Sequence, residues 1–457
     1  MAKKISKVVL LALGSLLSVV SCGGAGASSI ASSSSPLSSV TSSAVSSGLL
    51  ASSDETLYLA EMQKSFAFFI DSVSKDTTSP AYGLVADRAR GNIASTASTG
   101  FGLAALPIGI KHGWISQSDA EARAKITLQN LLKLPTLKGF YWHFIMMDDG
   151  TRSSGSEVST IDTAILVVGA LIAGAYFGGE VETAAQTLYA NVDWTAFLAS
   201  HNGQSQFRMA YNVDTSSFEG YWDYYAEQLM LYILGAGAPN EAHRTSLTEY
   251  NGFTKNSGSY GKGNSFIYSW FGSLFTYQFS HAFIDFRGLV DKYGVSWYQN
   301  SIGASEAAYQ WCIDKKGDYE TYGEGSWGLT ACDTKWGYNG YLGNQPRGWT
   351  SDTSYEANAA CTIAPAGALG SMPFTPKYSL QALRNYANEP TLQGKYGYYD
   401  AYDLVHNWTA TSYIGIDKGI TLLMMDNYLD GTIWGLSKKV AGIQDGLSRL
   451  GFTEGNA

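Results

Sequence analysis

Carboxylic acids are the side chains of this sequence that are best placed to do chemistry. Glu227 stands in the run Tyr-Trp-Asp-Tyr-Tyr-Ala-Glu-Gln-Leu-Met, where helical spacing would put Asp223, Glu227 and Met230 on one face. A carboxyl group on an apolar, aromatic face has a raised pKa, which suits a proton donor. The alternative role is a buried glutamate that only hydrogen-bonds its neighbours. We predict Glu227 as a general acid.

A general acid needs a partner that activates water or attacks the substrate, and three further acids are candidates. Asp400 lies in the aromatic run Tyr-Gly-Tyr-Tyr-Asp-Ala-Tyr, and Asp417 lies at an expected helix start. We predict that one of these two is the base. The alternative for each is a purely structural role, in which it makes hydrogen bonds within its loop or at a helix N-terminus. Glu157 joins the catalytic candidates because capping explains it less readily than it explains Asp162, which lies in a first helical turn.

Polar groups beside aromatic residues are candidates for contacts with a ligand. His281, Asp285 and Arg287 share one expected helical region, although a lone histidine on an aromatic face is more often satisfied within a core. Glu324 lies between glycines that bring backbone close to a ligand, or that serve a turn. The candidate substrate contacts are Asp87, Arg88, Trp142, His143, Asp162, Trp222, His281, Asp285, Arg287, Glu324, Trp327 and Tyr399.

Motifs of several other chemistries are missing from the sequence. It has no GxSxG elbow, no GxxxxGK[ST] loop, no HExxH pair and no CxxC pair. We therefore expect no nucleotide, no cofactor and no metal site, a structural zinc included. Cys312, Cys332 and Cys361 allow at most one disulfide.

The composition fits a carbohydrate cleft, in which aromatic faces stack on sugar rings and carboxylates bind hydroxyls or move protons. Aromatic residues make up 13% of the chain. The formal net charge of −9 argues against a nucleic-acid partner, which requires a basic face. We expect the partner to be a glucan polysaccharide or oligosaccharide.

Apolar residues recur with helical rather than alternating spacing over most of the chain. The spacing predicts helices over 57–71, 96–111, 117–134, 160–177, 182–200, 221–235, 274–293, 297–314, 365–369, 376–387, 414–428 and 433–450. This number of helices fits an all-α fold, an (α/α)6 toroid built as a closed ring of helical hairpins. The long Gly- and Trp-rich connections, such as 317–341 and 395–407, would form the rim of a cleft at one end.

The N-terminal segment has the pattern of a bacterial lipoprotein signal. Lys3, Lys4 and Lys7 precede an apolar stretch that is too short to span a bilayer and that ends in Val-Val-Ser-Cys22. An ordinary signal peptide with a chance cysteine is the alternative. We predict a signal peptide over 1–21, a Ser-rich tether over 22–53 and a catalytic domain over 54–457. Lipidated Cys22 would anchor the protein to the outer membrane of the cell envelope, facing the periplasm or the surface.

Ordered segments of the chain carry a family resemblance. They include Leu-Val-Ala-Asp-Arg (84–88), Gly-Phe-Tyr-Trp-His-Phe (139–144), Ser-Glu-Val-Ser-Thr-Ile-Asp-Thr-Ala (156–164), Gln-Phe-Ser-His-Ala-Phe-Ile-Asp-Phe-Arg-Gly (278–288) and Tyr-Ile-Gly-Ile-Asp (413–417). They resemble the glycoamylase-type domain family, which includes bacterial endo-β-1,2-glucanases and domains of cyclic β-1,2-glucan synthases. The similarity runs from about residue 57 to the C-terminus.

The resemblance implies an (α/α)6 barrel that hydrolyses β-1,2-linked glucose polymers with inversion. In this family the base is expected to reach the attacking water through a substrate hydroxyl, so the acids need not show the usual separation of roughly 6.5–9.5 Å. The chain departs from the family pattern at Ala226-Glu-Gln-Leu-Met230, where Glu-Ala-Met is common, and at Lys418, where Gln is common. Residues 333–358 also look expanded. These departures bear on product length and on endo against exo cleavage.

Three other functions stay open at the level of sequence. The chain could hydrolyse another glucan, such as an α-glucan, or bind glycans at the surface without cleaving them. A polysaccharide lyase on a helical toroid is disfavoured, because it would need basic clusters for uronates. A proton-donating carboxyl group on an apolar face favours an enzyme over a binding protein, which has no use for it.

Overall fold

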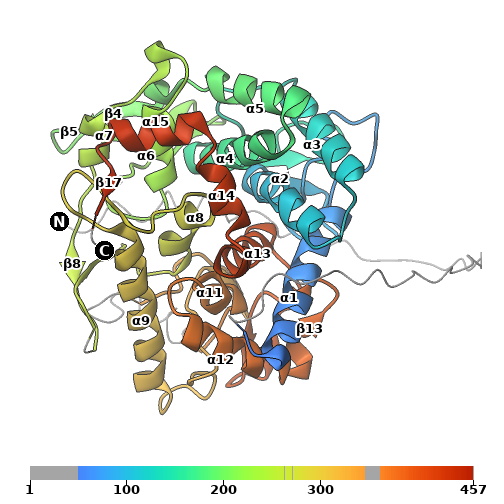
Figure 1. Cartoon of the computed structure of the whole chain (residues 1–457), viewed down its shortest axis with the longest axis vertical. Helices are drawn as coiled ribbons and strands as arrows, with labels where there is room; N and C mark the ends of the chain where they lie inside the picture. The colour runs from blue at the N-terminus through green and yellow to red at the C-terminus, as the bar shows by residue number, and fades with distance from the viewer. Residues whose placement is uncertain (1–49, 262, 270, 345–360, 456–457) are drawn as a thin grey trace, which may run out of the picture.

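The computed structural model describes residues 50–261, 263–269, 271–344 and 361–455, and over these residues the protein is mostly helical (Figure 1). The helices are α1 (Ser52–Asp71), α2 (Thr96–Lys111), α3 (Gln117–Leu131), α4 (Thr160–Phe177), α5 (Gly179–Asn191), α6 (Leu229–Ala236), α7 (Leu247–Asn251), α8 (Phe275–Phe283), α9 (Trp297–Lys315), α11 (Pro365–Gly370), α12 (Pro376–Ala387), α13 (Gly415–Leu429), α14 (Thr432–Ser437) and α15 (Ala441–Arg449). The predicted signal peptide and most of the predicted tether lie outside the described residues.

The strands are short and form small antiparallel sheets in the connections. They are β1 (Ile93–Ser95), β2 (Phe144–Met146), β3 (Val158–Ser159), β4 (Leu198–His201), β5 (Gln204–Phe207), β6 (Ala210–Asn212), β7 (Ser217–Glu219), β8 (Ser257–Gly258), β9 (Phe266–Ile267), β10 (Leu289–Val290), β11 (Cys332–Thr334), β12 (Gly337–Asn339), β13 (Gln393–Gly394), β14 (Gly397–Tyr398), β15 (Tyr402–Asp403), β16 (Trp408–Thr409) and β17 (Thr453–Glu454). Strands β3, β6 and β7 form one sheet, and the others pair two by two.

Six helices are buried on nearly every side, namely α2, α4, α6, α8, α11 and α13. Small and apolar residues occupy all faces of α6 and α11, whereas α8 and α13 also bury polar side chains such as His281 and Asp417. α4 is long and apolar enough to cross a membrane by composition, but most of it is buried inside the molecule. It is therefore a core helix of this fold.

The buried helices lie next to one another in a definite order. α2 contacts α4 and α13, α4 contacts α6, and α11 contacts both α8 and α13. In Figure 1, α8, α11 and α13 lie toward the middle, whereas α3, α5, α9 and α12 lie around the outside. The outer helices α3 and α5 bury one face only, as amphipathic sequences do.

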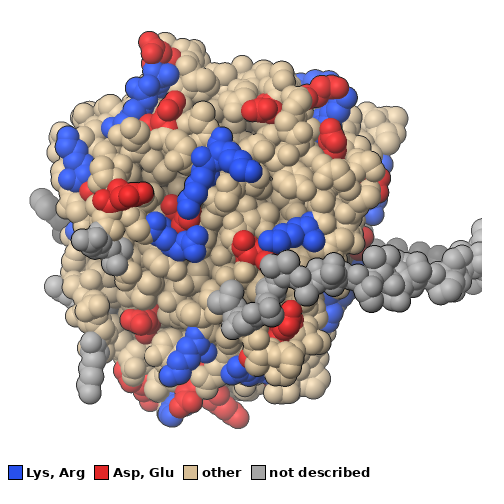
Figure 2. All heavy atoms as spheres, viewed as in Figure 1, with Lys and Arg blue, Asp and Glu red and all other residues tan. Residues whose placement is uncertain are grey.

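The surface view in Figure 2 shows acidic and basic side chains interspersed among other residues. This face carries no continuous basic patch, which agrees with the acidic composition.

Several predicted helix bounds need correction. The segment predicted as a helix over 182–200 ends as α5 at Asn191 and continues into the β4–β5 hairpin. The segment predicted over 433–450 is divided into α14 and α15, and α8 ends at Phe283 rather than near residue 293. The segment predicted over 221–235 becomes helical only from Leu229, which changes the setting of Glu227.

Helices α2 and α4 cross at glycines. A Cβ atom on Gly169 would lie 2.0 Å from the backbone oxygen of Gly100, and one on Gly100 would lie 2.3 Å from the oxygen of Ile165. Backbone atoms cannot move aside as a flexible side chain can, so only glycine permits this approach. The crossing places the N-terminal ends of the two helices side by side.

We expect Gly169→Ala to lower the free energy of unfolding by about 1–3 kcal/mol, because the added methyl group overpacks a backbone contact. Gly435→Ala is the matched control, since a Cβ atom there meets nothing within 4 Å and Gly435 is itself exposed on α14. Denaturant unfolding of both variants tests this expectation. Equal stability of the two variants would contradict the close crossing.

Candidate active site

The candidate acids collect at the N-terminal ends of buried helices. Asp162 lies in the first turn of α4 and Asp417 in the first turn of α13. Glu227 lies two residues before α6 begins. Helix N-terminal ends carry free N–H groups and a partial positive charge, so they favour acidic side chains and anionic transition states.

Glu227 lies in a bend before α6 rather than on the helical face that the spacing predicts. The preceding residues are extended because they pair with another segment: Thr254 N–H donates to Asp223 O (2.7 Å), and Tyr225 N–H donates to Thr254 O (3.1 Å). Burial raises the pKa of Glu227 to about 7, and the Asp162 carboxylate adds to the rise. The carboxyl group therefore keeps its proton close to neutral pH, as a general acid requires.

Ser280 of α8 holds the backbone on both sides of this bend. Its hydroxyl donates to the carbonyl oxygen of Glu227 (2.6 Å) and accepts from the N–H of Met230 (3.0 Å). The hydroxyl thus satisfies one of the free N–H groups at the start of α6. Ser280 acts as a positioning residue for Glu227.

We expect Ser280→Ala to lower kcat by up to about 100-fold with little change in KM, because Glu227 loses its fixed backbone. The buried Ser305 of α9, which hydrogen-bonds Ser371, provides a matched control. Ser305→Ala should cost comparable stability and leave kcat unchanged. Steady-state kinetics beside thermal unfolding distinguish the two; an equal loss of kcat in both variants would reduce the role of Ser280 to stability alone.

His143 lies between two carboxylates. Its Nδ1 is 2.9 Å from Glu157 Oε1, and its Nε2 is 3.5 Å from Asp162 Oδ1. Burial opposes a charge on His143, but the carboxylates of Asp162 and Glu157 outweigh burial and raise its pKa to about 9. Burial would raise the pKa of Glu157 as well, yet the His143 charge holds it below its usual value. Glu157 is thus suited to fixing His143 rather than to donating a proton.

Arg88 binds Asp333 through two parallel hydrogen bonds, from Nη1 to Oδ2 (2.7 Å) and from Nη2 to Oδ1 (3.0 Å). Ser412 also donates to Asp333. Asp87 lies beside Arg88, and burial raises the pKa of Asp87 in spite of the Arg88 charge. Asp333 is fully engaged in these contacts, so it fixes the site rather than moving a proton.

Asp400 and Asp417 form a buried pair of carboxyl groups that are hydrogen-bonded to each other. Asp400 Oδ2 accepts from the N–H of Asp333 (2.6 Å), whereas Asp400 Oδ1 and Asp417 Oδ2 receive no hydrogen bond from a described donor. Burial raises the pKa of Asp400 to about 6, and burial together with the Asp400 charge raises that of Asp417 well above its usual value. Sharing one proton satisfies both free oxygens, which makes Asp417 the donor and Asp400 the ionised partner.

A buried ion pair links the segments that carry Asp400 and Asp417. Lys418 Nζ of α13 lies 3.0 Å from Glu61 Oε1 of α1. Glu61 Oε2 also accepts from the N–H of Tyr398 (3.2 Å), two residues before Asp400. The departure from the family pattern at Lys418 thus serves to tie β14 to the first turn of α13, where Asp417 lies.

Electrostatic interactions connect these groups into one carboxylate network. Its members are Asp87, Arg88, His143, Glu157, Asp162, Glu227, Asp333, Asp400 and Asp417. Glu227 marks one end of the network, where it interacts with Asp162, and the Asp400–Asp417 pair marks the other. A carboxyl group at one end of the network can donate a proton while a carboxylate at the other end accepts one. Acid–base hydrolysis requires both groups.

Three predicted ligand contacts lie beside the network. Trp222 is buried, and its Nε1 donates to Thr160 Oγ1 (3.1 Å) at the start of α4. Trp142 is half-buried and bridges to β3 next to His143. Tyr399 precedes Asp400, and its half-buried ring lies 4.8 Å from the ring of Tyr413. Trp142 and Tyr399 therefore have aromatic surface left for stacking.

His281, Asp285 and Arg287 are not brought into the network. They lie at the C-terminal end of α8, where His281 Nε2 contacts Ser301 Oγ of α9 (3.0 Å). Asp285 binds Arg287 (2.9 Å) and Lys438 (2.9 Å). Burial lowers the pKa of His281 to about 3, so it stays neutral in the core.

Glu324 and Trp327 also lie apart from the network. Trp327 is fully buried, and its Nε1 donates to the backbone oxygen of Tyr378 (3.2 Å). Glu324 is exposed and accepts from Gln381 of α12 (3.2 Å). A fully buried indole offers no face to a sugar, so the aromatic character of this segment serves the core.

Asp333, Ser280 and Ser412 belong to the site, although they were not among the sequence candidates. Ser280 lies in a segment that carries the family resemblance, so its neighbourhood was a usable signal. Asp333 follows the buried Cys332 on β11, and its partners Arg88 and Ser412 are distant in sequence. No local spacing could have joined these three residues.

The cysteines and possible metal ligands lie outside the network. Cys312, Cys332 and Cys361 are buried free thiols, so the disulfide that their number allows does not form among them. Cys22 lies outside the described residues. Within the part of the chain that the structure describes, two groups of side chains are close enough to hold a metal ion, and neither includes a network residue.

Comparisons with known proteins relate this chain to one family model and to several β-1,2-glucan hydrolases. Residues 219–441 match the family model "Glycoamylase: Putative glucoamylase". The exo β-1,2-glucooligosaccharide sophorohydrolase (non-reducing end) of Parabacteroides distasonis is 26% identical over 407 residues, which cover 79% of this chain. The alignment covers 53% of that protein, so this chain spans about half the length of the curated relative.

Solved structures share the fold. The endo-β-1,2-glucanase from Chitinophaga pinensis, in complex with sophorotriose and glucose, is 26% identical with a TM-score of 0.77, covering 88% of this chain and 99% of that one. A β-1,2-glucanase from Parabacteroides distasonis, 23% identical, has the same fold with a TM-score of 0.77 over 87% of this chain and 60% of that one. The family match includes Glu227, Asp333, Asp400 and Asp417. Residues 219–441, just under half of the chain, thus match the glycoamylase family model.

Proposed function

We propose that this chain is a glycoside hydrolase that cleaves β-1,2-glucan, with endo action and inversion. One observation carries the proposal: a carboxyl group that stays protonated near neutral pH, Glu227, shares a network with an ionisable carboxyl pair, in a chain that covers 99% of the Chitinophaga endo-β-1,2-glucanase. The curated relative also acts on β-1,2-linked glucose oligosaccharides by its name. These relatives support the substrate class.

In the proposed mechanism, Glu227 donates its proton to the oxygen of the scissile glycosidic bond. Asp400 takes a proton from the attacking water, either directly or through a substrate hydroxyl, as the family resemblance implies. Asp417 holds the shared proton of the pair and keeps Asp400 ionised above pH about 6. The charges of Arg88 and His143 offset part of the negative charge of the surrounding carboxylates.

The proposal includes an (α/α)6 barrel. We infer that α2, α4, α6, α8, α11 and α13 form the inner ring. The contacts of α4 with α6 and of α8 with α11, and the hydrogen bonds of Ser280 to the start of α6, support this order. Such a ring would bring the N-terminal ends of its helices to the end where the network lies.

Two rival functions predict different results. A surface glycan-binding protein would have no use for a buried carboxyl pair and a proton-bearing glutamate, both of which cost free energy to bury. A hydrolase of another glucan would use the same acids on a different linkage. The linkage of the glucan that is cleaved is what distinguishes this last function from the proposed one.

The test is to incubate the protein with linear β-1,2-glucan, and in parallel with starch and β-1,3-glucan. Short products from β-1,2-glucan alone, of mixed length and with the α-anomer released first, would support endo action and inversion. Sophorose as the single early product would replace endo with exo cleavage. Bound but intact glucan would favour the binding protein instead.

We also propose that the protein is lipidated at Cys22 and resides in the outer membrane, facing the periplasm or the surface. The support is the basic, apolar and Cys-terminated order of residues 1–22. Cys22→Ala should move the protein from the membrane to the soluble fraction. An unchanged membrane fraction would contradict lipid anchoring at this residue.

A further inference from the structure

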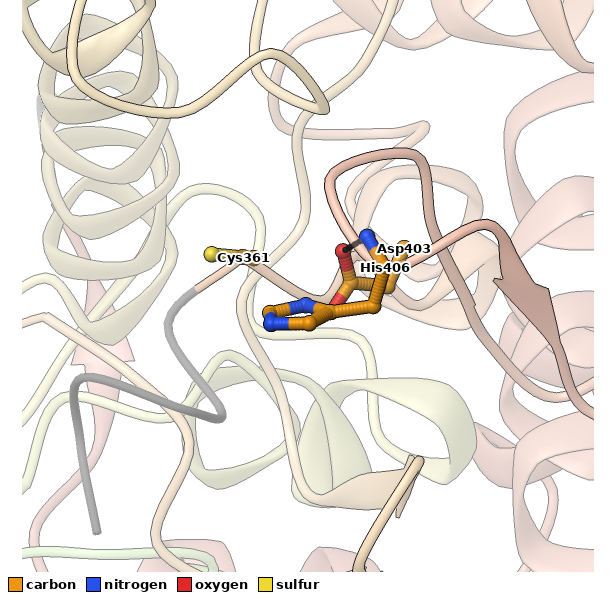
Figure 3. A group of neighbouring side chains, drawn as sticks. All are labelled: Cys361, Asp403 and His406. Carbon is orange, nitrogen blue, oxygen red and sulfur yellow. Dashed lines mark hydrogen bonds and ion pairs between the residues drawn. The ribbon is translucent and has the colours of Figure 1, made fainter.

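Three side chains outside the carboxylate network come together behind its loops. Cys361 lies just before α11, Asp403 ends β15, and His406 lies in the turn between β15 and β16. One ligand atom of each lies within 4.8 Å of those of the other two. Figure 3 shows the imidazole of His406 between the sulfur of Cys361 and the carboxylate of Asp403.

The buried carboxylate of Asp403 has one ionisable partner among the described residues. The Asp403 side chain is fully buried, and its ion-pair partner among the described residues is His406, at 2.8 Å from Nδ1. The His406 N–H also donates to Asp403 Oδ1 (3.1 Å). No described lysine or arginine pairs with Asp403. A buried carboxylate of this kind needs a compensating cation.

We propose that Cys361, Asp403 and His406 bind one Zn²⁺ ion. A thiolate, a carboxylate and an imidazole are the ligands that zinc takes in proteins, at about 2.3 Å for sulfur and about 2.0–2.2 Å for nitrogen and oxygen. The thiolate selects against Mg²⁺ and Ca²⁺, which prefer oxygen ligands. The thiolate and carboxylate charges together neutralise the ion, so the complex suits a buried position.

A second observation points to the same place. The hydroxyl of Tyr322 is buried without a hydrogen-bond partner among the described residues, and it interacts electrostatically with Cys312, Cys361, Tyr319 and Asp403. Three protein ligands leave the fourth position of a tetrahedral ion open to water.

In the other group of possible ligands, His112, Asp426 and Asp430, both carboxylates already have partners, whereas His112 Nε2 lies 3.3 Å from Asp430 Oδ2 without a hydrogen bond. Thr432, the first residue of α14, donates hydrogen bonds to both carboxylate oxygens of Asp426, at 2.9 and 3.0 Å. Lys111 pairs with Asp430 at 3.0 Å. Its charges therefore need no metal ion.

Zinc at this position would join segments that carry network residues. Ile363 and Tyr402 exchange two backbone hydrogen bonds of 2.9 Å, and Asp400 lies two residues before Tyr402. Trp336, between β11 and β12, packs edge-on against His406 at 4.8 Å, and β11 carries Asp333. The ion would fix the loops that hold Asp333 and Asp400, as a structural clamp.

The sequence does not reveal this site because its ligands lack the usual spacing. The sequence has no CxxC pair, and Cys361 is far along the chain from Asp403 and His406. The expectation that no zinc is bound rests on that missing pair, whereas the fold supplies the ligands from two segments.

The test uses the full chain, freed of metal by a chelator and then titrated with Zn²⁺ or Co²⁺. We expect about one ion per chain, and the cobalt form should show the charge-transfer absorption of a thiolate ligand. The absorption needs no variant, and it separates this site from the group with His112, which has no cysteine. Stoichiometric cobalt without thiolate absorption, or no binding at all, would overturn the proposal.

Matched variants locate the ligands. Cys361→Ser and His406→Asn should lose the bound ion, while Cys312→Ser, at a buried thiol of α9, and His243→Asn, at a half-buried histidine far along the chain from the site, should keep it. Zinc should raise the melting temperature of the parent protein and of the two controls, but not of the ligand variants. Equal zinc binding by the parent and by His406→Asn would overturn the assignment.

Discussion

Glu227→Gln is expected to lower kcat on β-1,2-glucan about 10³-fold, with little change in KM. The amide has the shape of the protonated carboxyl group and fits the same buried bend, but its N–H protons are too weakly acidic to be transferred to the leaving oxygen. Binding of the glucan should persist, because the rest of the network is unchanged. Reducing ends released per enzyme, measured with the parent protein and the variant at saturating glucan, give the ratio directly.

The same residue sets the alkaline limb of the pH profile. Burial raises the pKa of Glu227 to about 7, so the proton-bearing form, and with it kcat/KM, should fall as pH rises through about 7. The fold favours the protonated form, so ionisation also costs stability between the ordinary glutamate pKa and about pH 7. Glu227→Gln cannot ionise and should therefore be more stable than the parent protein at pH 8, though not at low pH.

Glu241→Gln is the matched control, because Glu241 lies on the surface in a pair with Arg244. It should change neither kcat nor the pH profile. Full activity of Glu227→Gln with an intact fold would remove Glu227 from the chemistry. A loss of activity together with a loss of stability at pH 8 would make it a structural glutamate.

The helices that the sequence predicts best are those whose ends carry their own signals. α2, α4 and α12 begin and end where the apolar spacing predicts. Ser95 and Ser159 accept from N–H groups in the first turns of α2 and α4, and Pro376 begins α12. Local chemistry decides such ends, so a single sequence reveals them.

Other bounds depend on contacts that a single sequence does not show. The chain around Asp223 is extended because it pairs with Thr254, although its residue spacing favours a helix. At Asn202-Gly203 a signal was present: both residues have positive φ, 52° and 76°, and they join β4 to β5. This dipeptide is the strongest short-range sign of a hairpin, and it outweighs the helical spacing before it.

Some residues of the candidate site could likewise be predicted from local sequence, whereas others could not. Acids at helix starts, such as Asp162 and Asp417, could be predicted because the position of a helix start is local information. Trp327 could not be told from a stacking platform, because its burial depends on α12 packing over it. Asp333 is joined to Arg88 only by the fold, since the two residues are far apart in sequence.

Asp400→Asn is expected to lower kcat about 10³-fold as well, because an amide cannot take the proton of the attacking water. Burial and the Asp333 charge raise the pKa of Asp400 to about 6, while the hydrogen bond from Asp417 opposes them. A base must be ionised, so kcat/KM should fall as pH drops through about 6. With the limb of Glu227, the profile should be bell-shaped, with its maximum between about pH 6 and about pH 7.

Two substitutions of Asp417 test which member of the pair is the base. Asp417→Asn keeps a donor to Asp400, so the acid limb should stay near pH 6 or move lower, and much of the activity should remain. Asp417→Ala removes that donor, so the pKa of Asp400 should rise and the acid limb should move to higher pH. Asp318→Asn, at an exposed residue paired with Lys315, is the control and should leave the profile unchanged.

The opposite pattern would exchange the two roles. If Asp417→Asn lost as much activity as Asp400→Asn is expected to lose, while Asp400→Asn kept it, Asp417 would be the base and Asp400 its partner. Equal and complete losses in both asparagine variants would mean that the pair works only as a unit that shares one proton. The macroscopic pKa values would then belong to the pair rather than to either residue. In each case the acid limb belongs to the Asp400–Asp417 pair, and an acid limb that neither residue shifts would place the base elsewhere in the network.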